Sequence, residues 1–166
     1  MATSTVSSLM PRAAEIVHKL NPCVNALLLA KTHASMQREA MRKIDLELID
    51  WLAPVYGNIH SGKVGKPITD PKHLWMMGDE EAANYYAERD KAIRKAGYDV
   101  KPGYCPALIA EEVERIAART LIEASEEFFG TSADDLICSG IANYNKFVDL
   151  LIGLVVNHPN YRKPKI

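Results

Sequence analysis

The chain has 166 residues, a formal net charge of −1, and 48% hydrophobic, 25% charged and 7% aromatic residues. This length favours a single domain with its own hydrophobic core. The near-neutral charge and the few aromatic residues argue against a dedicated nucleic-acid-binding protein. The cysteines, Cys23, Cys105 and Cys138, are isolated and indicate neither a disulfide framework nor a zinc site. Reduced thiols and a cytoplasmic location are therefore expected.

The amino-terminal third is expected to form two helices. Residues 1–8 are predicted to be disordered, and they lack the basic and apolar segments of a secretory signal. A first helix begins near Pro11 and ends at Asn21, because the residue before a proline avoids the helical region. Pro22 suits the first position of a second helix, which is expected to continue to about Leu52.

This second helix carries a long apolar stripe. Its members are Val24, Leu27, Leu28, Ala34, Met41, Ile44, Leu48 and Leu52. At a rise of roughly 1.5 Å per residue the stripe extends over about 45 Å. Such a length is typical of the spine of a bundle or of a dimer, so we predict a homodimer.

The middle of the chain is rich in glycine and proline. Residues 54–78 are predicted to form one long loop, and a connection of that length is usually functional or mobile. A further helix is expected to begin at Asp79 and to end at Gly97. A short linker then leads into the last third of the chain.

Residues 105–157 are expected to form an antiparallel helical hairpin. Pro106 suits the first position of its first helix, and Gly130 can end that helix in the left-handed conformation. Thr131 or Ser132 then caps the second helix, and so short a turn makes the two helices antiparallel neighbours. The core face predicted for the first helix consists of Ile109, Val113, Ile116, Ala117, Leu121, Ala124 and Phe128.

The second helix of the hairpin is apolar nearly all round from Leu150 to Val156. This pattern is typical of a central core helix or of a subunit interface. Charged residues interrupt the run well short of the about 20 apolar residues of a transmembrane helix, so no membrane contact is predicted. Pro159 ends the helix, and residues 159–166 form a basic tail for which nucleic-acid contact is not favoured. The whole pattern predicts an all-α bundle of about five helices in one domain, 1–166.

The long loop contains most of a phosphate-binding motif. Gly57, Gly62 and Lys63 have the spacing at which backbone N–H groups cradle phosphates and a lysine neutralises them. Val64, however, stands where a hydroxyl would hold magnesium, and a helix rather than a strand precedes the motif. Two interpretations remain open, an anion or nucleotide site and a plain loop. The candidate ligand-binding residues are His60, Lys63, Lys66 and His73.

A second pattern points to metal binding. Glu15 and His18 form a Glu-x-x-His pair on the first expected helix. Di-metal helical bundles use such a pair twice, together with glutamates from other helices. The chain has only one pair, so an ordinary helix surface is the alternative interpretation.

The segment from Gly97 to Leu108, reading GYDVKPGYCPAL, and the later Cys138-Ser139-Gly140 resemble uncharacterised small proteins of bacteria and their prophages. The resemblance covers roughly the last third of the chain. No activity is known for that group, so it carries over no functional residue. It implies a bacterial or phage origin and a cytoplasmic location.

These observations lead to a ranked expectation of function. The first is a small interaction or assembly protein that self-associates through its helices, without catalysis or a cofactor. The second is a small-molecule, anion or nucleotide-binding protein or enzyme that uses residues 57–73. The third is a metal-binding helical bundle.

Overall fold

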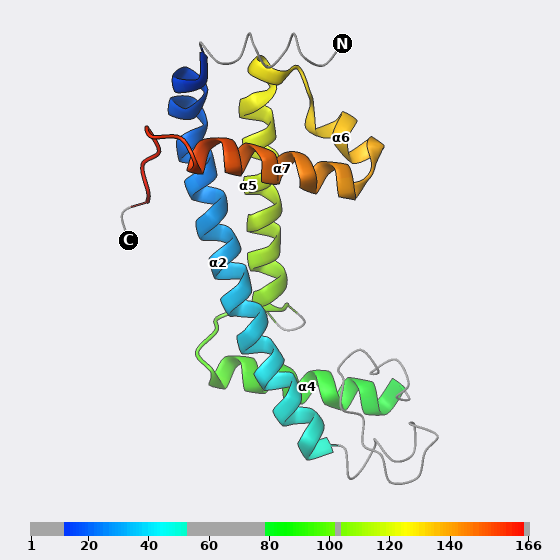
Figure 1. The fold of residues 1–166 in the computed structure, drawn as a ribbon. Coiled ribbons are helices and arrows are strands. Elements are labelled where there is room, and N and C mark those ends of the chain that lie inside the picture. Colours follow the sequence, from blue (N-terminus) through cyan, green and yellow to red (C-terminus); the bar gives the residue numbers. More distant parts are fainter. Residues whose placement is uncertain (1–11, 53–78, 102–103, 165–166) are drawn as a thin grey trace. The chain divides into compact units, whose positions relative to one another are not determined.

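The computed structural model describes residues 12–52, 79–101 and 104–164, and in these ranges the chain forms five α-helices and no strand. The helices are α2 (Ala13–Leu52), α4 (Asp79–Lys95), α5 (Pro106–Phe129), α6 (Ala133–Ser139) and α7 (Ile141–Val156). The predicted all-α helical bundle is confirmed (Figure 1). Residues 1–8 and 54–78, predicted as a disordered end and a loop, lie outside the described ranges. None of the described helices has the length and hydrophobicity that crossing a bilayer requires.

Helix α2 corrects the prediction of a break at Asn21, because it runs through Pro22 without interruption. Proline inside a helix lacks the N–H that would bond to the carbonyl four residues earlier, here that of His18. The cost is typically about 3 kcal/mol. Leu20 and Val24, on either side of Pro22, are fully buried, and their packing offsets this cost. Tertiary burial therefore overrides the local signal at the proline.

Three of the helix ends that depend on glycine or a cap lie where the sequence predicts them. Gly97 and Gly130 have φ values of 93° and 65°, the left-handed region that favours glycine and ends α4 and α5. The Gly130 N–H donates to the carbonyl of Glu126 at 2.7 Å. Ser132 caps α6, since its hydroxyl accepts from the N–H of Asp135 at 3.1 Å.

The second arm of the predicted hairpin differs from the expectation of one helix. Gly140, with φ 118° and ψ 148°, separates α6 from α7. The side-chain amide of Asn143 donates to the carbonyl of Ser139 at 3.1 Å, and so satisfies one end of α6. After this break α7 crosses the first half of α2 and the second half of α5, rather than running back along α5 (Figure 1).

The described chain falls into two compact units that share the helices α2 and α5. The first comprises the described parts of Met1–His33 and Glu111–Ile166, and the second those of Ala34–Ala110. Buried apolar side chains of α2, α5, α6 and α7 form the core of the first unit. They are Ile16, Val17, Leu20, Val24, Leu27, Ala118, Leu121, Ile122, Ala133, Tyr144, Val148, Leu151 and Val155.

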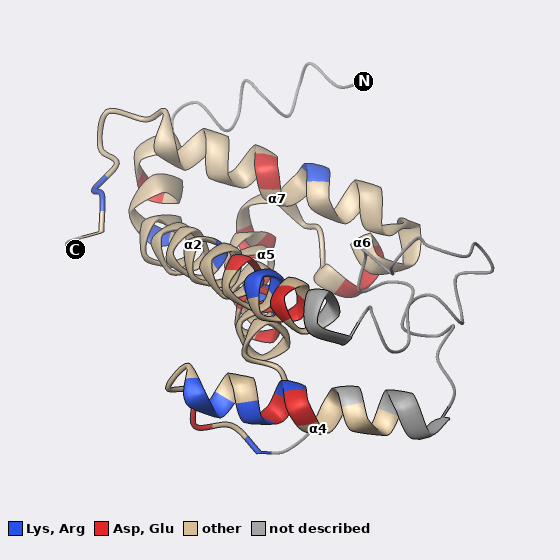
Figure 2. Ribbon diagram, turned by 90° about the horizontal axis from the view of Figure 1, so that it is seen from below, with Lys and Arg blue, Asp and Glu red and all other residues tan. Residues whose placement is uncertain are grey.

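This core explains why α7 is nearly uncharged. Lys146 and Asp149 are the charged residues of α7, and Figure 2 shows them as isolated marks along an otherwise neutral helix. Leu151 and Val155 are fully buried, while Leu154 is partly buried against the same core. The apolar end of this helix is thus largely covered by the chain itself.

The second unit has a smaller apolar cluster. Its buried members are Met41, Ile93, Cys105 and Ala107, with Ile44, Tyr98 and Val100 packed against them. Beside the cluster Arg89 Nε donates to Asp45 Oδ1 at 2.6 Å, and Arg89 Nη2 lies 3.2 Å from Asp45 Oδ2. Asp45 is buried, and removing one partner of a buried ion pair typically costs about 3–5 kcal/mol. This pair therefore fastens α4 to α2 within the second unit.

The long stripe predicted on α2 is accordingly buried at several of its described positions. Val24 and Leu27 belong to the core of the first unit, and Met41 belongs to that of the second. These residues do not offer a free surface for a dimer. A surface for self-association must therefore lie at other positions.

Candidate functional site

Among the described residues, α5 carries the longest run of exposed apolar side chains along one helix. Ile109, Val113 and Ile116 keep 45%, 52% and 52% of their surface exposed. They were predicted to face the core, and that prediction is wrong for these three residues. The face that is buried carries Ala110, Ala118, Leu121 and Ile122. Helix α5 thus has two apolar faces, and the chain covers one of them.

We define the outer face of α5 as Ile109, Val113, Ile116 and Thr120. Their spacing of four, three and four residues keeps all four side chains on one side of the helix. The Thr120 hydroxyl donates to the carbonyl of Ile116 at 2.9 Å, so its methyl group is the part left for contact. The outer face is therefore an apolar strip on a single continuous helix.

Charged residues line one edge of this strip. Arg115 donates to Glu112 through Nε at 2.8 Å and Nη2 at 2.6 Å. These hydrogen bonds and the nearby positive charge hold the pKa of the Glu112 carboxyl below its usual range. Arg119 donates to Glu123 and to Asp134, each at 2.9 Å. All these groups are exposed, so their ion pairs are weak and can rearrange.

A separate pocket lies beside the first turns of α2. It has a volume of ≈ 530 Å³ and is lined by Ala14, His18, Asn21, Pro22, Asn160 and Arg162. The first four residues come from α2, and the last two come from the segment that follows α7. The pocket therefore brings together residues that are about 140 positions apart in the chain.

Two asparagines hold the segment after α7 in place. The Asn21 side chain accepts from the Arg162 N–H at 2.8 Å and donates to the Arg162 carbonyl at 2.9 Å. Asn25 donates to the same carbonyl at 2.8 Å. The Tyr161 hydroxyl donates to Asn25 Oδ1 at 2.9 Å, and its ring packs against the core. We call these four hydrogen bonds the asparagine clamp.

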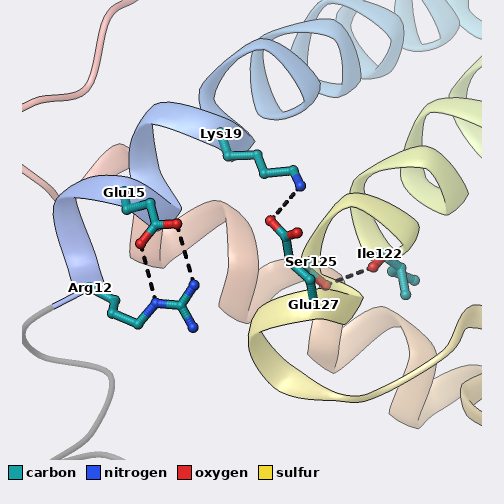
Figure 3. A network of polar contacts seen from close by, with 6 residues as sticks. All are labelled: Arg12, Glu15, Lys19, Ile122, Ser125 and Glu127. Carbon is teal, nitrogen blue, oxygen red and sulfur yellow. Dashed lines mark hydrogen bonds and ion pairs between the residues drawn. The ribbon is translucent and has the colours of Figure 1, made fainter.

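The proposed metal pair is not joined by further ligands in the structure. Arg12 donates to the Glu15 carboxylate at 3.2 and 3.3 Å, and these bonds hold the pKa of Glu15 below its usual range (Figure 3). His18 is exposed and lines the pocket. Within the described ranges no three histidine, cysteine or acidic side chains gather as metal ligands would. Metal binding by Glu15 and His18 stays a prediction.

Figure 3 also shows two further polar contacts, one between α2 and α5 and one within α5. Lys19 of α2 pairs with Glu127 of α5, which ties these helices together at the surface of the first unit. On α5 the buried hydroxyl of Ser125 donates to the carbonyl of Ile122 at 2.7 Å, so this polar group is satisfied inside the core. Lys19, Glu127 and Ser125 thus each have a partner within the chain.

The other predicted ligand-binding residues cannot be placed. His60, Lys63, Lys66 and His73 all lie outside the described residues. The anion, nucleotide or enzyme function assigned to residues 57–73 therefore stays a prediction.

The cysteines give no sign of a catalytic centre. Cys23, Cys105 and Cys138 are all free thiols. Burial raises the pKa of Cys23, which disfavours its thiolate form. Cys105 is buried, and its sulfur lies 3.8 Å from Arg89 Nη2. Cys105 thus has the packing of a structural residue.

Sequence reasoning identified His18 but missed Arg162 as its neighbour in the pocket, since no local pattern links them.

Comparison of the chain with protein-family models, with curated proteins and with solved structures gives no match. The geometry described above is therefore the basis for assigning a function.

Proposed function

We propose that this protein is a non-catalytic interaction protein that forms a homodimer through the outer face of α5. The observation that carries the proposal is the exposure of Ile109, Val113 and Ile116 along one side of a helix. Exposed apolar side chains that form a continuous strip, rather than scattered single residues, mark interaction sites.

The spacing of the strip suits a helical partner. Apolar residues that alternate by four and three positions form the seam of a coiled coil, in which each side chain inserts between those of the facing helix. Val113 and Thr120 occupy the a positions of this repeat, and Ile109 and Ile116 occupy the d positions. The seam covers 11 residue steps, about 16 Å along the axis. So short a seam favours a weak dimer that dissociates on dilution.

The residues beside the seam favour an antiparallel pair. In the same repeat Glu112 and Arg119 occupy g positions, whereas Ala110 and Ala117 occupy e positions. Antiparallel helices place g positions opposite each other, so each Glu112 faces an Arg119 across the seam. On the opposite edge of the seam the half-buried Ala117 and the buried Ala110 add no charge. A parallel pair would set both charges against alanines, without this compensation.

The occupant that fits is a second copy of the same chain. A two-fold symmetric interface requires that a residue contact its counterpart in both directions, so the surface must complement itself. With the axis passing between Val113 and Ile116, these two residues pack against each other twice. Glu112 and Arg119 likewise pair twice, so this helix face satisfies the condition alone.

A bacterial or phage origin and a cytoplasmic location form part of the proposal. The free thiols of all three cysteines and the resemblance of Gly97–Leu108 to small bacterial and prophage proteins support this part.

Sedimentation equilibrium over a range of concentrations tests the proposal. We compare the unaltered protein with Ile116→Glu, which places a charge in the middle of the seam. The matched control is Leu150→Glu, because Leu150 is 55% exposed on a different helix, α7. We expect a concentration-dependent dimer for the unaltered protein and for the control, and a monomer for Ile116→Glu.

Two outcomes would overturn the proposal. One is an unaltered protein that stays monomeric at concentrations of tens of micromolar and above. The other is a dimer that Leu150→Glu and Ile116→Glu weaken to the same extent. Circular dichroism of each variant confirms that the helices are retained.

A further inference from the structure

The pocket beside the first turns of α2 has a composition that suits a charged ligand. The described residues that line it include three with donor side chains, His18, Asn160 and Arg162, together with the apolar Ala14 and Pro22. Its volume of ≈ 530 Å³ falls in the range of small-molecule sites, which is about 300–1,000 Å³. None of the described lining residues belongs to the outer face of α5.

The charges around the pocket show which groups are available to a ligand. Arg12 is bound to Glu15, and Lys19 is paired with Glu127, so these nearby cations are compensated within the chain. The side chains of His18 and Arg162, by contrast, make no hydrogen bond or ion pair in the part of the chain that the structure describes. The lining residues that the structure describes include no acidic side chain. Among them, His18 and Arg162 therefore have no compensating anion.

The asparagine clamp fixes the position of the Arg162 backbone, from which the guanidinium side chain extends. Asn21 binds both the N–H and the carbonyl of Arg162, and Asn25 binds that carbonyl a second time. Tyr161 already anchors the segment through its buried ring and its hydrogen bond to Asn25. The additional bonds hold the backbone of Arg162 beside α2. Such preorganisation lowers the entropy that a ligand must remove on binding.

We propose that this pocket binds a small organic anion through Arg162 and His18. Guanidinium groups bind both carboxylates and phosphates by paired, charge-assisted hydrogen bonds, so the shared ligand class is an oxyanion. His18 and Asn160 donate to the remaining oxygen atoms, while the carbon skeleton lies against Ala14 and Pro22. The binding needs no metal and no covalent step.

The test is a titration followed by the imidazole resonances of His18 in the full chain. The probes are pyrophosphate and citrate, each at constant pH and at constant ionic strength set with sodium chloride. We expect a saturable shift with at least one of them. A preference for pyrophosphate identifies a phosphate site, and a preference for citrate identifies a carboxylate site. No saturable shift with either probe overturns the proposal.

Two variants with equal loss of charge decide whether the pocket is responsible. Arg162→Gln removes the guanidinium but keeps the backbone that the asparagine clamp holds. Lys163→Gln is the matched control, since Lys163 is the next residue and does not line the pocket. We expect Arg162→Gln to weaken binding by tenfold or more, and Lys163→Gln to change it less than threefold. Equal weakening by both variants shows a diffuse electrostatic effect and contradicts a defined site.

Discussion

The inner face of α5 carries Leu121 and Ile122 fully buried, whereas its outer face carries Val113 and Ile116 half exposed. Both faces are apolar, and both follow helical spacing. They differ in what lies opposite them, since Ala118, Leu121 and Ile122 of the inner face pack into the core of the first unit. Periodicity therefore identifies an apolar face but not the surface that covers it.

Small residues explain which face the chain uses. Ala110 and Ala118 are buried on the inner side, and small side chains let neighbouring helices approach closely. Leu121 and Ile122 are fully buried in the core of the first unit. The outer face has branched side chains at every apolar position, in the spacing that suits a partner helix. The two faces therefore have different packing roles, and substitutions on them should have different effects.

The largest expected effect is on the inner face. Leu121→Ala removes a fully buried side chain and should lower the free energy of unfolding by about 2–5 kcal/mol. Urea unfolding at a concentration where the protein is monomeric measures this loss. The control is Val113→Ala on the outer face, which should change it by no more than about 0.5 kcal/mol. Similar losses for the two variants would show that the faces do not differ as described.

A smaller effect is expected for the charges beside the seam. Glu112→Arg or Arg119→Glu alone sets like charges against each other in the antiparallel dimer, and should weaken dimerisation by about five- to tenfold. The double variant reverses both charges and should restore most of the affinity. Sedimentation equilibrium measures all three. Additive weakening in the double variant would argue against the pairing of Glu112 with Arg119.

The smallest expected effect is a dependence of dimerisation on pH. Hydrogen bonds from Arg115 and its charge lower the pKa of Glu112 below the ordinary value of 4.5, so the carboxylate stays charged at and above that pH. A lowered pKa means that the charge of Glu112, which the proposed pairing with Arg119 needs, is present above 4.5 and is lost only as pH falls through the lower value in the folded chain. Dimerisation should thus be constant from pH 7 to 5 and weaken below 4.5. In Glu112→Gln this acidic weakening should be reduced, and an unchanged profile would exclude Glu112 as its source.

The parts of the fold that depend on local chemistry were predictable. Gly97, Gly130 and Ser132 end or begin helices at the expected places, because a left-handed glycine and a capping hydroxyl act over a few residues. The continuation of α2 through Pro22 was not predictable in the same way. It depends on the burial of Leu20 and Val24 against residues far along the chain.

The candidate site was predictable only in part, for the same reason. A Glu-x-x-His pattern drew attention to His18, yet the pattern indicated a metal and gave no sign of Arg162. The contact between Asn21 and Arg162 joins residues 141 positions apart, and no local spacing encodes it. The outer face of α5 was visible as an apolar pattern. Its exposure became clear only when the core of the first unit was known.

Cysteine cross-linking measures most directly whether the outer face of α5 meets a second copy in antiparallel order. The exposed Cys138 is first replaced by serine, and Ile109→Cys is then mixed with Thr120→Cys under mild oxidation. A disulfide requires Cα atoms within about 7 Å. We expect a covalent dimer in the mixture of the two variants and little covalent dimer in either variant alone. Efficient cross-linking of Ile109→Cys with itself would contradict the antiparallel order, and no cross-link in any sample would contradict the interface.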